Sequence, residues 1–600
     1  MKLRQIKRKF KSSFSFWLII FIAAITRLIW FDKAPGSITN DELHYILTVK
    51  SVALTGHDFS GSWNIFTSLI FTQPFGLLHS ELPYLLLYPA ISLTSFSIFT
   101  SRITYVIISI ATVWVIFQLG RILFDKKTAL IAAFLASINP WMIFIGRTTY
   151  EMVPATFFYF LGIYFLIKEK SWRILISLPI FFLAFYSYRP TKIIFIPIVL
   201  AVSIYAYFLN KKQFSKQYLI LNIICLFLII FYIVLQLNSS QEARLSEVFS
   251  PFSQNITNSI QARNSMVQNG LLAELFNSKF FIYSTELFQK SLQTLSPSYL
   301  FYYGDSFFFL RLHGPFYLLD AVFLLIGAAY LFIEKRKEFF LIFALSIIGI
   351  FPEIFFNSRV LLTHHIAIFI VLALFIIAYG VGRVGASKYK LIFIIFLYLI
   401  SFINFFQIYF FQIPFKSQGS FSFATRELAN YIKFEQKRGQ KVNVYAATPQ
   451  DAYIKYANDF NNGEGIIESP IFINGPEDLY TKYIYYTNNL DIKTYDQVVK
   501  SLLSQKYSIG KINFFACKDI ESNYDPKAVT IYETRMCPPA KVFGKTYQIK
   551  NLVDASTIYI IYNGLACEKY KLNSYPKISF DDLSIERLSE KYFCEKFISK

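Results

Sequence analysis

Charged residues are scarce in this chain of 600 residues. They make up 16% of it, whereas hydrophobic residues make up 54% and aromatic residues 19%. Soluble globular domains carry about 25% charged residues, so this composition excludes an ordinary soluble protein. Apolar runs of about 17–25 residues recur between residues 14 and 411, the length needed to cross a ~30 Å hydrocarbon core. The sequence therefore predicts a polytopic α-helical membrane protein.

Acidic residues are especially rare before residue 415. Through residue 414 we count 17 Asp and Glu against 34 Lys and Arg, and beyond it 21 against 25. Most of the net charge of +21 thus lies in the membrane part, in short clusters between apolar runs. Clusters of this kind follow the positive-inside rule, which favours membrane topology over nucleic-acid binding as the origin of the charge.

The apolar runs predict eleven transmembrane helices. We expect them at 14–31, 101–123, 128–146, 151–167, 173–188, 192–209, 218–237, 316–333, 339–356, 359–382 and 390–411. If the basic residues 1–13 are cytoplasmic, every later basic cluster between spans also falls in the cytoplasm. This topology predicts a multi-pass protein of the cell membrane whose C-terminal part is extracytoplasmic.

The same topology divides the chain into domains. Residues 14–411 form the predicted transmembrane domain, with two long outer loops, 32–100 and 238–315. Residues 415–600 form the predicted extracytoplasmic domain. There, helical patterns alternate with strand patterns at 441–447, 512–516 and 557–562, which favours a small α/β domain. The helical patterns of this domain lie at 425–440, 451–460 and 495–505.

Cysteine is also rare, and its placement is informative. Of five cysteines, one (Cys225) lies in an apolar run, and the others lie in the last 84 residues, at Cys517, Cys537, Cys567 and Cys594. Four cysteines in one soluble region predict two disulfides and an oxidising compartment. Of three pairings, the shortest loops favour Cys517–Cys537 and Cys567–Cys594. A zinc site is disfavoured because the chain has no C-x-x-C pair.

Two adjacent carboxylates, Asp41 and Glu42, follow the first apolar run. One interpretation is the solvated start of a helix with Asn40 as N-cap, where acids are favourable to the helix dipole. The other is a general base at the membrane boundary, its proton affinity raised by partial desolvation. The rarity of acids in this part of the chain favours the second interpretation.

Three cations are predicted on the outer side, against the charge bias. Arg147 could pair with Glu151 one helical turn away, or bind a phosphate with its planar fork while Glu151 orients it. Arg189 and Lys192 flank Pro190. They could be a snorkelling pair at the interface or a second cation site.

A further polar group lies near the tenth predicted span. It contains Arg359 at an outer turn and His364 with His365 about a turn deeper. We expect these groups to be satisfied inside the helix bundle. Adjacent histidines on a helix point in different directions, so we predict no metal ligands here.

The order of these motifs resembles the GT-C membrane glycosyltransferases, nearest to the protein O-mannosyltransferase and aminoarabinose transferase (ArnT-like) group. The resemblance spans roughly residues 12–411 and rests on this series: Asp41-Glu42-x-x-Tyr45, Thr55-Gly56-x-Asp58-x-x-Gly61, Pro83-Tyr84, Ser101-Arg102, Asn139-Pro140-Trp141 and Arg147-x-x-x-Glu151. It implies transfer of a sugar from a polyprenyl phosphate, with inversion, on the outer face of the membrane.

The resemblance also implies roles for individual residues. Asp41 is the expected catalytic base, with Glu42 as its partner. The donor phosphate is assigned to Arg147, with Arg189 and Lys192 on the same side. Sugar binding or orientation is assigned to Glu151, Tyr45, Asp58 and Tyr150. Arg359 and His364 are further site candidates that the resemblance does not align. No cofactor is evident from the sequence, and a divalent cation stays an open alternative.

The sequence thus predicts a hexosyl- or pentosyltransferase acting on a lipid, glycan or protein acceptor, in contact with the bilayer and not with nucleic acid. One alternative is a transporter or flippase for a lipid-linked sugar. Transporters usually carry ionisable groups in mid-span beside an internal repeat, and this sequence shows no repeat. A second alternative is a non-catalytic scaffold for envelope assembly.

Overall fold

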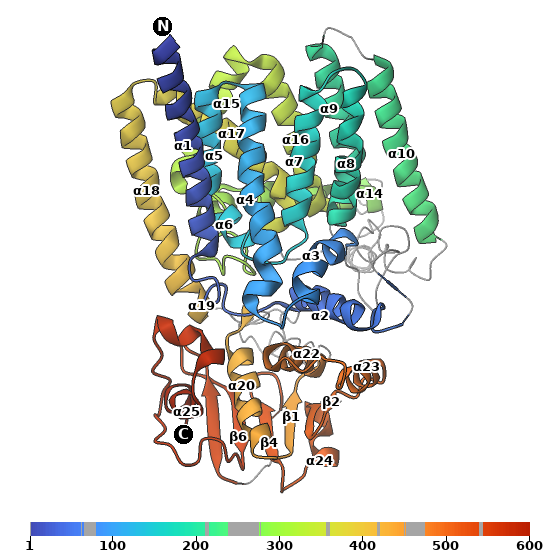
Figure 1. Cartoon of the computed structure of the whole chain (residues 1–600), viewed down its shortest axis with the longest axis vertical. Helices are drawn as coiled ribbons and strands as arrows, with labels where there is room; N and C mark the ends of the chain where they lie inside the picture. Colours follow the sequence, from blue (N-terminus) through green and yellow to red (C-terminus); the bar gives the residue numbers. More distant parts are fainter. Residues whose placement is uncertain are drawn as a thin grey trace. The chain divides into compact units, whose positions relative to one another are not determined.

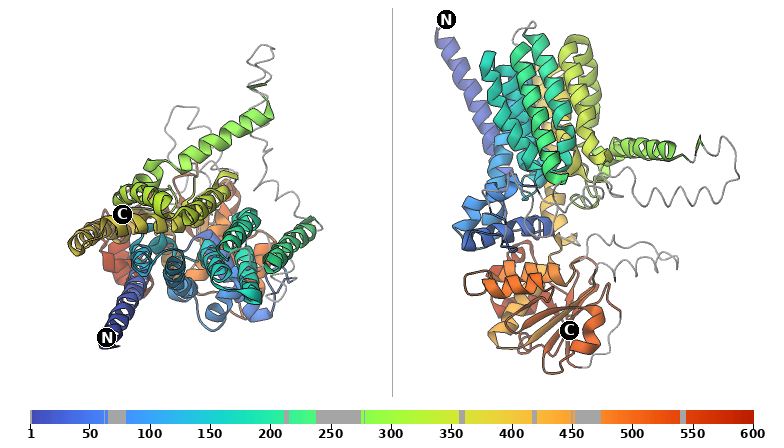
Figure 2. Two further views of the ribbon diagram at one scale, coloured as in Figure 1. Left: turned by 90° about the horizontal axis from the view of Figure 1, so that it is seen from above. Right: turned by 90° about the vertical axis from the view of Figure 1, so that its right-hand side faces the viewer.

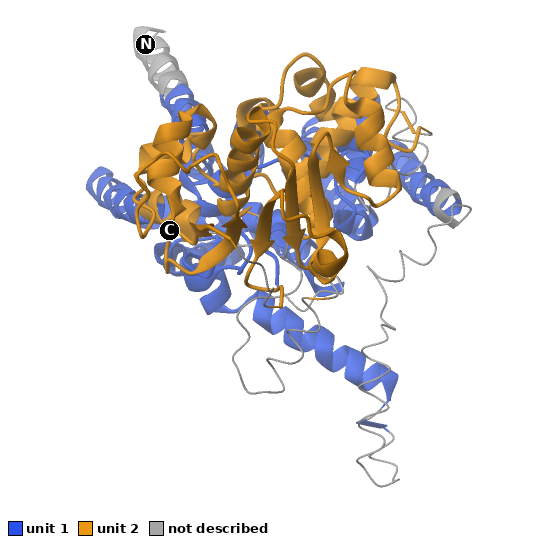
Figure 3. Cartoon of the chain, turned by 90° about the horizontal axis from the view of Figure 1, so that it is seen from below, with its two compact units in different colours: residues 1–29, 68–83, 105–405 blue, residues 30–67, 84–104, 406–600 orange. Residues whose placement is uncertain are grey.

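The computed structural model forms two compact units (Figure 3). Unit 1 contains residues 1–29, 68–83 and 105–405, and unit 2 contains residues 30–67, 84–104 and 406–600. Most of the predicted first outer loop, except residues 68–83, therefore belongs to the same unit as the C-terminal residues. The structure describes residues 2–61, 63–64, 80–210, 215–237, 275–276, 278–355, 361–416, 421–448, 451, 474–538 and 544–600.

Unit 1 is a bundle of apolar helices that run side by side (Figure 1). Its members are α1 (Lys2–Leu28), α4 (Ile98–Leu123), α5 (Lys126–Ile138), α6 (Pro140–Ile145), α7 (Met152–Lys168), α8 (Ser177–Ser187), α9 (Phe195–Leu209), α10 (Ser215–Leu237), α15 (Leu318–Glu334), α16 (Arg336–Phe355), α17 (Ala367–Val384) and α18 (Lys388–Phe411). The division between the units falls within α4 and α18.

Every predicted span coincides with a helix or with two consecutive helices. Pro140 separates α5 from α6, where its fixed φ suits the first turn and the Asn139 side chain accepts a hydrogen bond from Met142 N at 3.0 Å. Six helical stretches in the described part of the chain are long and apolar enough to cross a membrane. The structure thus confirms a helical membrane protein, while the count of eleven crossings stays a prediction.

Close helix packing in unit 1 depends on two glycines. A Cβ added to Gly327 of α15 would come within 2.0 Å of the Ile376 carbonyl oxygen of α17. A Cβ on Gly380 would lie 2.4 Å from the Phe323 carbonyl oxygen. Small residues permit such close approach where lipid removes the hydrophobic advantage of packing. Accordingly, α17 is the most buried of the membrane-length helices, with 83% of its apolar window covered.

One helix of unit 1 has a different direction. α14 (Lys279–Thr294) runs at a steep angle to the bundle helices and extends away from them (Figure 2). Ser278 caps it by accepting a hydrogen bond from Phe281 N at 3.2 Å. It falls within the predicted outer loop 238–315, of which residues 238–274 lie outside the described residues.

Unit 2 contains a seven-stranded mixed sheet in the order β2-β3-β1-β4-β6-β5-β7. The strands are β1 (Val442–Ala446), β2 (Ser508–Ile509), β3 (Ile512–Ala516), β4 (Val529–Glu533), β5 (Thr546–Lys550), β6 (Thr557–Tyr562) and β7 (Ile598–Ser599). β1 pairs in parallel with β3 and β4. Its five residues are all buried, as expected for a central strand covered on both faces.

Helices complete the predicted α/β domain. α20 (Ala424–Lys437) and α22 (Pro476–Thr487) both pack on β1, and α23 (Tyr495–Leu503) packs on β2. The sequence predicted β1, β3, β6, α20 and α23 within a few residues. It missed α22. The predicted helix 451–460 lies outside the described residues, apart from residue 451.

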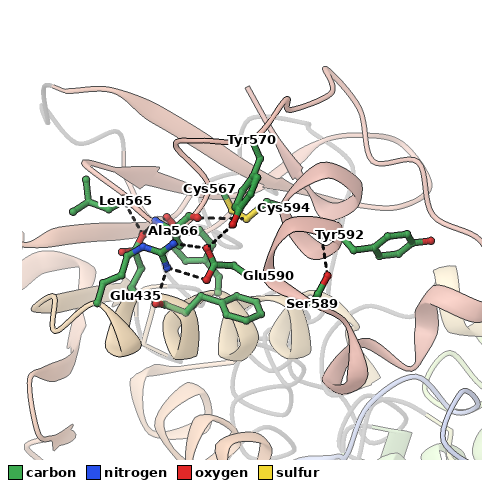
Figure 4. Close-up of a disulfide and its surroundings, with 12 residues drawn as sticks. Glu435, Leu565, Ala566, Cys567, Tyr570, Ser589, Glu590, Tyr592 and Cys594 are labelled. Atoms are coloured by element: carbon green, nitrogen blue, oxygen red, sulfur yellow. Dashed lines mark hydrogen bonds and ion pairs between the residues drawn. A yellow bond between two sulfur atoms is a disulfide. The ribbon is translucent and has the colours of Figure 1, made fainter.

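Two disulfides fasten this domain. Cys517–Cys537 joins the ends of β3 and β4, with a Cα–Cα distance of 5.7 Å. Cys567–Cys594 joins the segment after β6 to α25 (Glu590–Phe597), with a Cα–Cα distance of 5.4 Å (Figure 4). Beside it, Glu435 accepts hydrogen bonds from the backbone N–H groups of Leu565 and Ala566 (Figure 4). These are the pairings that the shortest loops favour.

Candidate functional site

In unit 2, the first turn of α2 (Asn40–Thr55) gives the two adjacent carboxylates, Asp41 and Glu42, different surroundings. Thr39, rather than Asn40, is the N-cap, and it forms a reciprocal capping box with Glu42. Glu42 Oε2 accepts from Thr39 N at 3.0 Å, and Thr39 Oγ1 accepts from Glu42 N at 3.3 Å. This geometry buries Glu42 and leaves Asp41 exposed.

Glu42 is also bound by an arginine that the sequence did not single out for this role. Arg102 donates from Nε to Glu42 Oε1 at 2.8 Å and from Nη2 to Glu42 Oε2 at 2.9 Å. The same Nη2 donates to the Ser37 carbonyl oxygen at 2.8 Å, and both charged side chains are fully buried. A bidentate pair of this kind is rigid. Glu42 therefore holds the turn that presents Asp41 instead of facing solvent beside it.

Two further candidates from the predicted first loop, Tyr45 and Asp58, lie beside a group of aromatic rings in unit 2. Tyr45 lies 4.7 Å from Tyr84, and Tyr84 lies 5.0 Å from Trp63, between ring centroids. Asp58 organises the adjoining loop by accepting from Ser60 Oγ at 2.7 Å and from Trp63 N at 3.2 Å. Tyr45 and Asp58 are each 1% exposed. They shape the loop beside α2, and their assigned roles in sugar binding stay predictions.

Arg147, in unit 1, has a structural partner that the sequence did not reveal. It is fully buried, and its Nη1 donates to the backbone carbonyl oxygens of Thr26 at 3.3 Å and Arg27 at 2.9 Å. These carbonyls belong to the last turn of α1, where a cation offsets the helix dipole. These contacts give Arg147 a structural role, and its assignment to the donor phosphate stays a prediction.

A cluster of charged side chains lies elsewhere in unit 1. This set, which we call the charged cluster, consists of Glu81, Glu151, Arg189, Lys192, Lys290, Glu353, His364 and His365. Lys192 Nζ lies 3.1 and 3.0 Å from the two carboxylate oxygens of Glu81, and 3.8 Å from the ring centroid of Tyr232. Tyr232 donates to Glu81 at 3.1 Å. The sequence reasoning missed Glu81, although an acid in an apolar, proline-containing stretch was the available signal.

The segment around Ser80 connects Glu151 with the cations. Ser80 N donates to Glu151 Oε1 at 3.2 Å, and Ser80 Oγ accepts from Arg189 N at 3.0 Å. Glu151 also interacts electrostatically with Lys192 and His364. The structure thus brings together Glu151, Arg189 and Lys192, which the sequence predicted separately.

The histidines complete the charged cluster. His365 Nδ1 lies 2.6 Å from Glu353 Oε2, and Lys290 Nζ lies 3.9 Å from Glu353 Oε1. His364 is 9% exposed and its ring packs against Tyr150 and Phe308 at centroid distances of 5.8 and 5.1 Å. Arg359 lies outside the described residues. Within those residues, no three His, Cys, Asp or Glu side chains are grouped as metal ligands would be.

Residues 79–236 match the family model of the dolichyl-phosphate-mannose-protein mannosyltransferases. This stretch is about a quarter of the chain, and it bears out the predicted resemblance for those residues. It includes four members of the charged cluster, namely Glu81, Glu151, Arg189 and Lys192. No curated protein sequence matches the chain significantly.

Two solved membrane proteins superpose on much of the chain. Archaeal oligosaccharyltransferase AglB from Archaeoglobus fulgidus, solved with an inhibitory peptide and a dolichol-phosphate, does so at 12% identity and a TM-score of 0.44, over 88% of this chain and 70% of AglB. ArnT from Cupriavidus metallidurans, solved in the apo state and bound to undecaprenyl phosphate, does so at 9% identity and a TM-score of 0.44, over 91% of this chain and 97% of ArnT. These scores are too low for a comparison residue by residue.

Proposed function

We propose that this protein is an inverting glycosyltransferase that moves a sugar from a polyprenyl-phosphate carrier to a hydroxyl group of a lipid, glycan or protein acceptor. The observation that carries the proposal is the family match over residues 79–236, which include the cationic side chains Arg189 and Lys192. The exposed Asp41, on a turn held by Glu42 and Arg102, supports it as a carboxylate that an acceptor can reach.

In this proposal Asp41 is the general base. A hydroxyl group is a poor nucleophile until a base accepts its proton in the transition state, and such assistance contributes about 10²–10⁴-fold. Asp41 is exposed, so an acceptor can approach its carboxylate. The hydroxyl oxygen attacks the anomeric carbon, the bond to the carrier phosphate breaks, and the proton passes to Asp41. One displacement inverts the anomeric configuration.

The leaving group gains negative charge, which the charged cluster is suited to offset. Lys192 carries a compact ammonium group that can exchange one oxygen partner for another, and Glu81 is its present partner. Arg189 is partly exposed, and its charge interacts with that of Lys192. Preorganised cations of this kind stabilise developing charge on a phosphate oxygen. We assign Arg189 and Lys192 to the donor phosphate and Glu151 to their orientation.

Several finer points belong to the same proposal. The donor sugar is a hexose or a pentose, and the reaction takes place on the outer face of the membrane. The N-terminus is cytoplasmic and the sheet domain is extracytoplasmic, which agrees with its two disulfides.

The test is transfer of radiolabelled sugar from a panel of polyprenyl-phosphate sugars into membrane fractions. Wild type should incorporate label from one donor, and Asp41→Asn should lose it while keeping the thermal unfolding midpoint of wild type. Asp496→Asn, an exposed aspartate on α23, is the matched control and should transfer normally. Full activity of Asp41→Asn would contradict the base assignment, and no transfer by folded wild type from any donor would contradict the proposed function.

A further inference from the structure

Helix α22, of the C-terminal sheet domain, packs on α2, the helix that carries Asp41. α22 follows Gly475, whose N–H donates to the Asp478 carboxylate in its first turn at 2.9 Å. Lys482 lies one turn further along, on the same face as Asp478. Both helices belong to unit 2.

The packing of α22 on the first loop is held by two tyrosines. Tyr486 Oη accepts from Ile38 N at 3.0 Å and shares a hydrogen bond of 2.7 Å with Ser37 Oγ. Tyr485 Oη shares a hydrogen bond of 2.9 Å with Ser101 Oγ. Ile38 directly precedes Thr39, the N-cap of α2. α22 is therefore joined to the capping turn that places Asp41.

Lys482 is an unusual lysine because it is 1% exposed. Its Nζ donates to Asn474 Oδ1 at 2.6 Å, and the anions that it faces are Asp478 on its own helix and Glu42 on α2. Burial lowers the pKa of Lys482 to about 8. A buried ammonium group is costly unless an anion compensates it, and Glu42 is already neutralised by Arg102. Asp478, one helical turn earlier on α22, is the anion that stabilises the charged form of Lys482 most.

Asp478 in turn interacts electrostatically with Asp41 on α2. Asp478 faces Lys482, Glu477 and Asp41, and burial raises the pKa of Asp478 to about 6. Within that value, the negative charges of Glu477 and Asp41 add to the effect of burial, and the positive charge of Lys482 opposes it. Two neighbouring aspartates disfavour each other's ionised form unless a cation lies close by. Lys482, one helical turn from Asp478, is that cation.

We propose that Lys482 and Asp478 are positioning residues for Asp41: the buried ammonium group of Lys482, on the helix that packs against α2, offsets the negative charge of the two aspartates. The inference rests on the proposed function only in treating Asp41 as the base. It gives the C-terminal domain a part in the reaction centre beyond any recognition of an acceptor.

The first test is independent of sugar transfer. Full-length protein in detergent is treated with a carbodiimide, which modifies protonated carboxyl groups, and labelling of Asp41 is followed by mass spectrometry against pH. Lys482→Met should raise the pH of half-labelling by about one unit or more, because a compensating cation is lost. Asp478→Asn should lower it. Lys482→Arg should restore the wild-type value, and Lys500→Met, an exposed lysine on α23, should not change it.

Opposite shifts in Lys482→Met and Asp478→Asn are not expected from general loosening of the fold. An unchanged midpoint in both variants would overturn the inference. Because the labelling requires no substrate, a shift without any sugar transfer by wild type would support the electrostatic coupling while contradicting the proposed function.

The second test uses transfer itself. Lys482→Met should lower kcat about tenfold or more with little change in KM for the lipid donor, since the donor phosphate is assigned elsewhere. The wild-type rate should fall above about pH 8, where Lys482 loses its proton. Lys482→Arg should move that fall to higher pH, because an arginine stays charged. Normal kcat and an unchanged pH profile in Lys482→Met would overturn the inference.

Discussion

Unit 1 and unit 2 each contain a buried ion pair, and the two pairs differ in what they can do. In unit 2, two nitrogens of Arg102 donate to the Glu42 carboxylate, and one of these nitrogens also donates to the Ser37 carbonyl oxygen. Neither charged side chain is exposed. In unit 1, Lys192 holds Glu81 with a single nitrogen over the ring of Tyr232, and the side chains are 11% and 5% exposed. A guanidinium fork fixes geometry, whereas an ammonium group can change partners. The first pair therefore suits a structural role, and the second suits the exchange of partners that we propose for the donor phosphate.

The largest expected effect separates the two adjacent acids of α2. Asp41→Asn should lower kcat by about 10²–10⁴-fold, because the base is lost, with an unchanged unfolding midpoint. Steady-state transfer assays and thermal unfolding in detergent measure the two quantities. A variant that keeps its kcat but unfolds earlier would give Asp41 the structural role that we assign to Glu42.

The second prediction concerns the buried pair of Arg102 and Glu42. Arg102→Met leaves Glu42 buried without its main cation, which should cost about 3–5 kcal/mol of unfolding free energy. The double variant Arg102→Met/Glu42→Gln should recover most of that loss, because no uncompensated charge remains. Denaturant titration of the full-length protein in detergent, followed by tryptophan fluorescence, measures the stability of both variants. Equal stability of the single and double variants would contradict the coupling between the two residues.

The third prediction uses pH. Lys482 has a pKa lowered by burial to about 8, below the 10.5 of an ordinary lysine, so between these values the unfolded chain binds the proton and the folded chain does not. Stability should therefore rise with pH across this window, by about 3 kcal/mol in total. Lys482→Met should remove the rise, and Lys500→Met should keep it. A wild-type stability that is flat from pH 8 to 10 would contradict the burial of a charged Lys482.

The smallest expected effect concerns the pair of Lys192 and Glu81. Lys192→Met should raise KM for the lipid donor about tenfold, because one phosphate contact is lost. Its unfolding midpoint should change less than that of Arg102→Met, since Tyr232 still donates to Glu81. Lys192→Arg should keep the donor affinity in part. A larger loss of stability in Lys192→Met than in Arg102→Met would reverse the comparison between the units.

Sequence patterns were sufficient where a single physical requirement decides the outcome. Apolar length fixed the helices of the membrane part, because an unpaired backbone cannot cross hydrocarbon. Alternating patterns located β1, β3 and β6, and loop length favoured the two disulfides found between Cys517 and Cys537 and between Cys567 and Cys594. The match over residues 79–236 agrees with the family that the motifs resemble.

Only the tertiary structure decided which charged groups meet. The sequence places Asp41 beside Glu42 at the start of one helix, whereas the capping box and Arg102, sixty residues from Glu42, bury Glu42 and leave Asp41 exposed. Glu81 with Lys192, Arg147 with the end of α1, and Lys482 near Glu42 are likewise distant in the chain. Hydrophobic periodicity is a local property that a sequence displays directly. The partner of a charge depends on how elements pack, so it emerges only once the chain is folded.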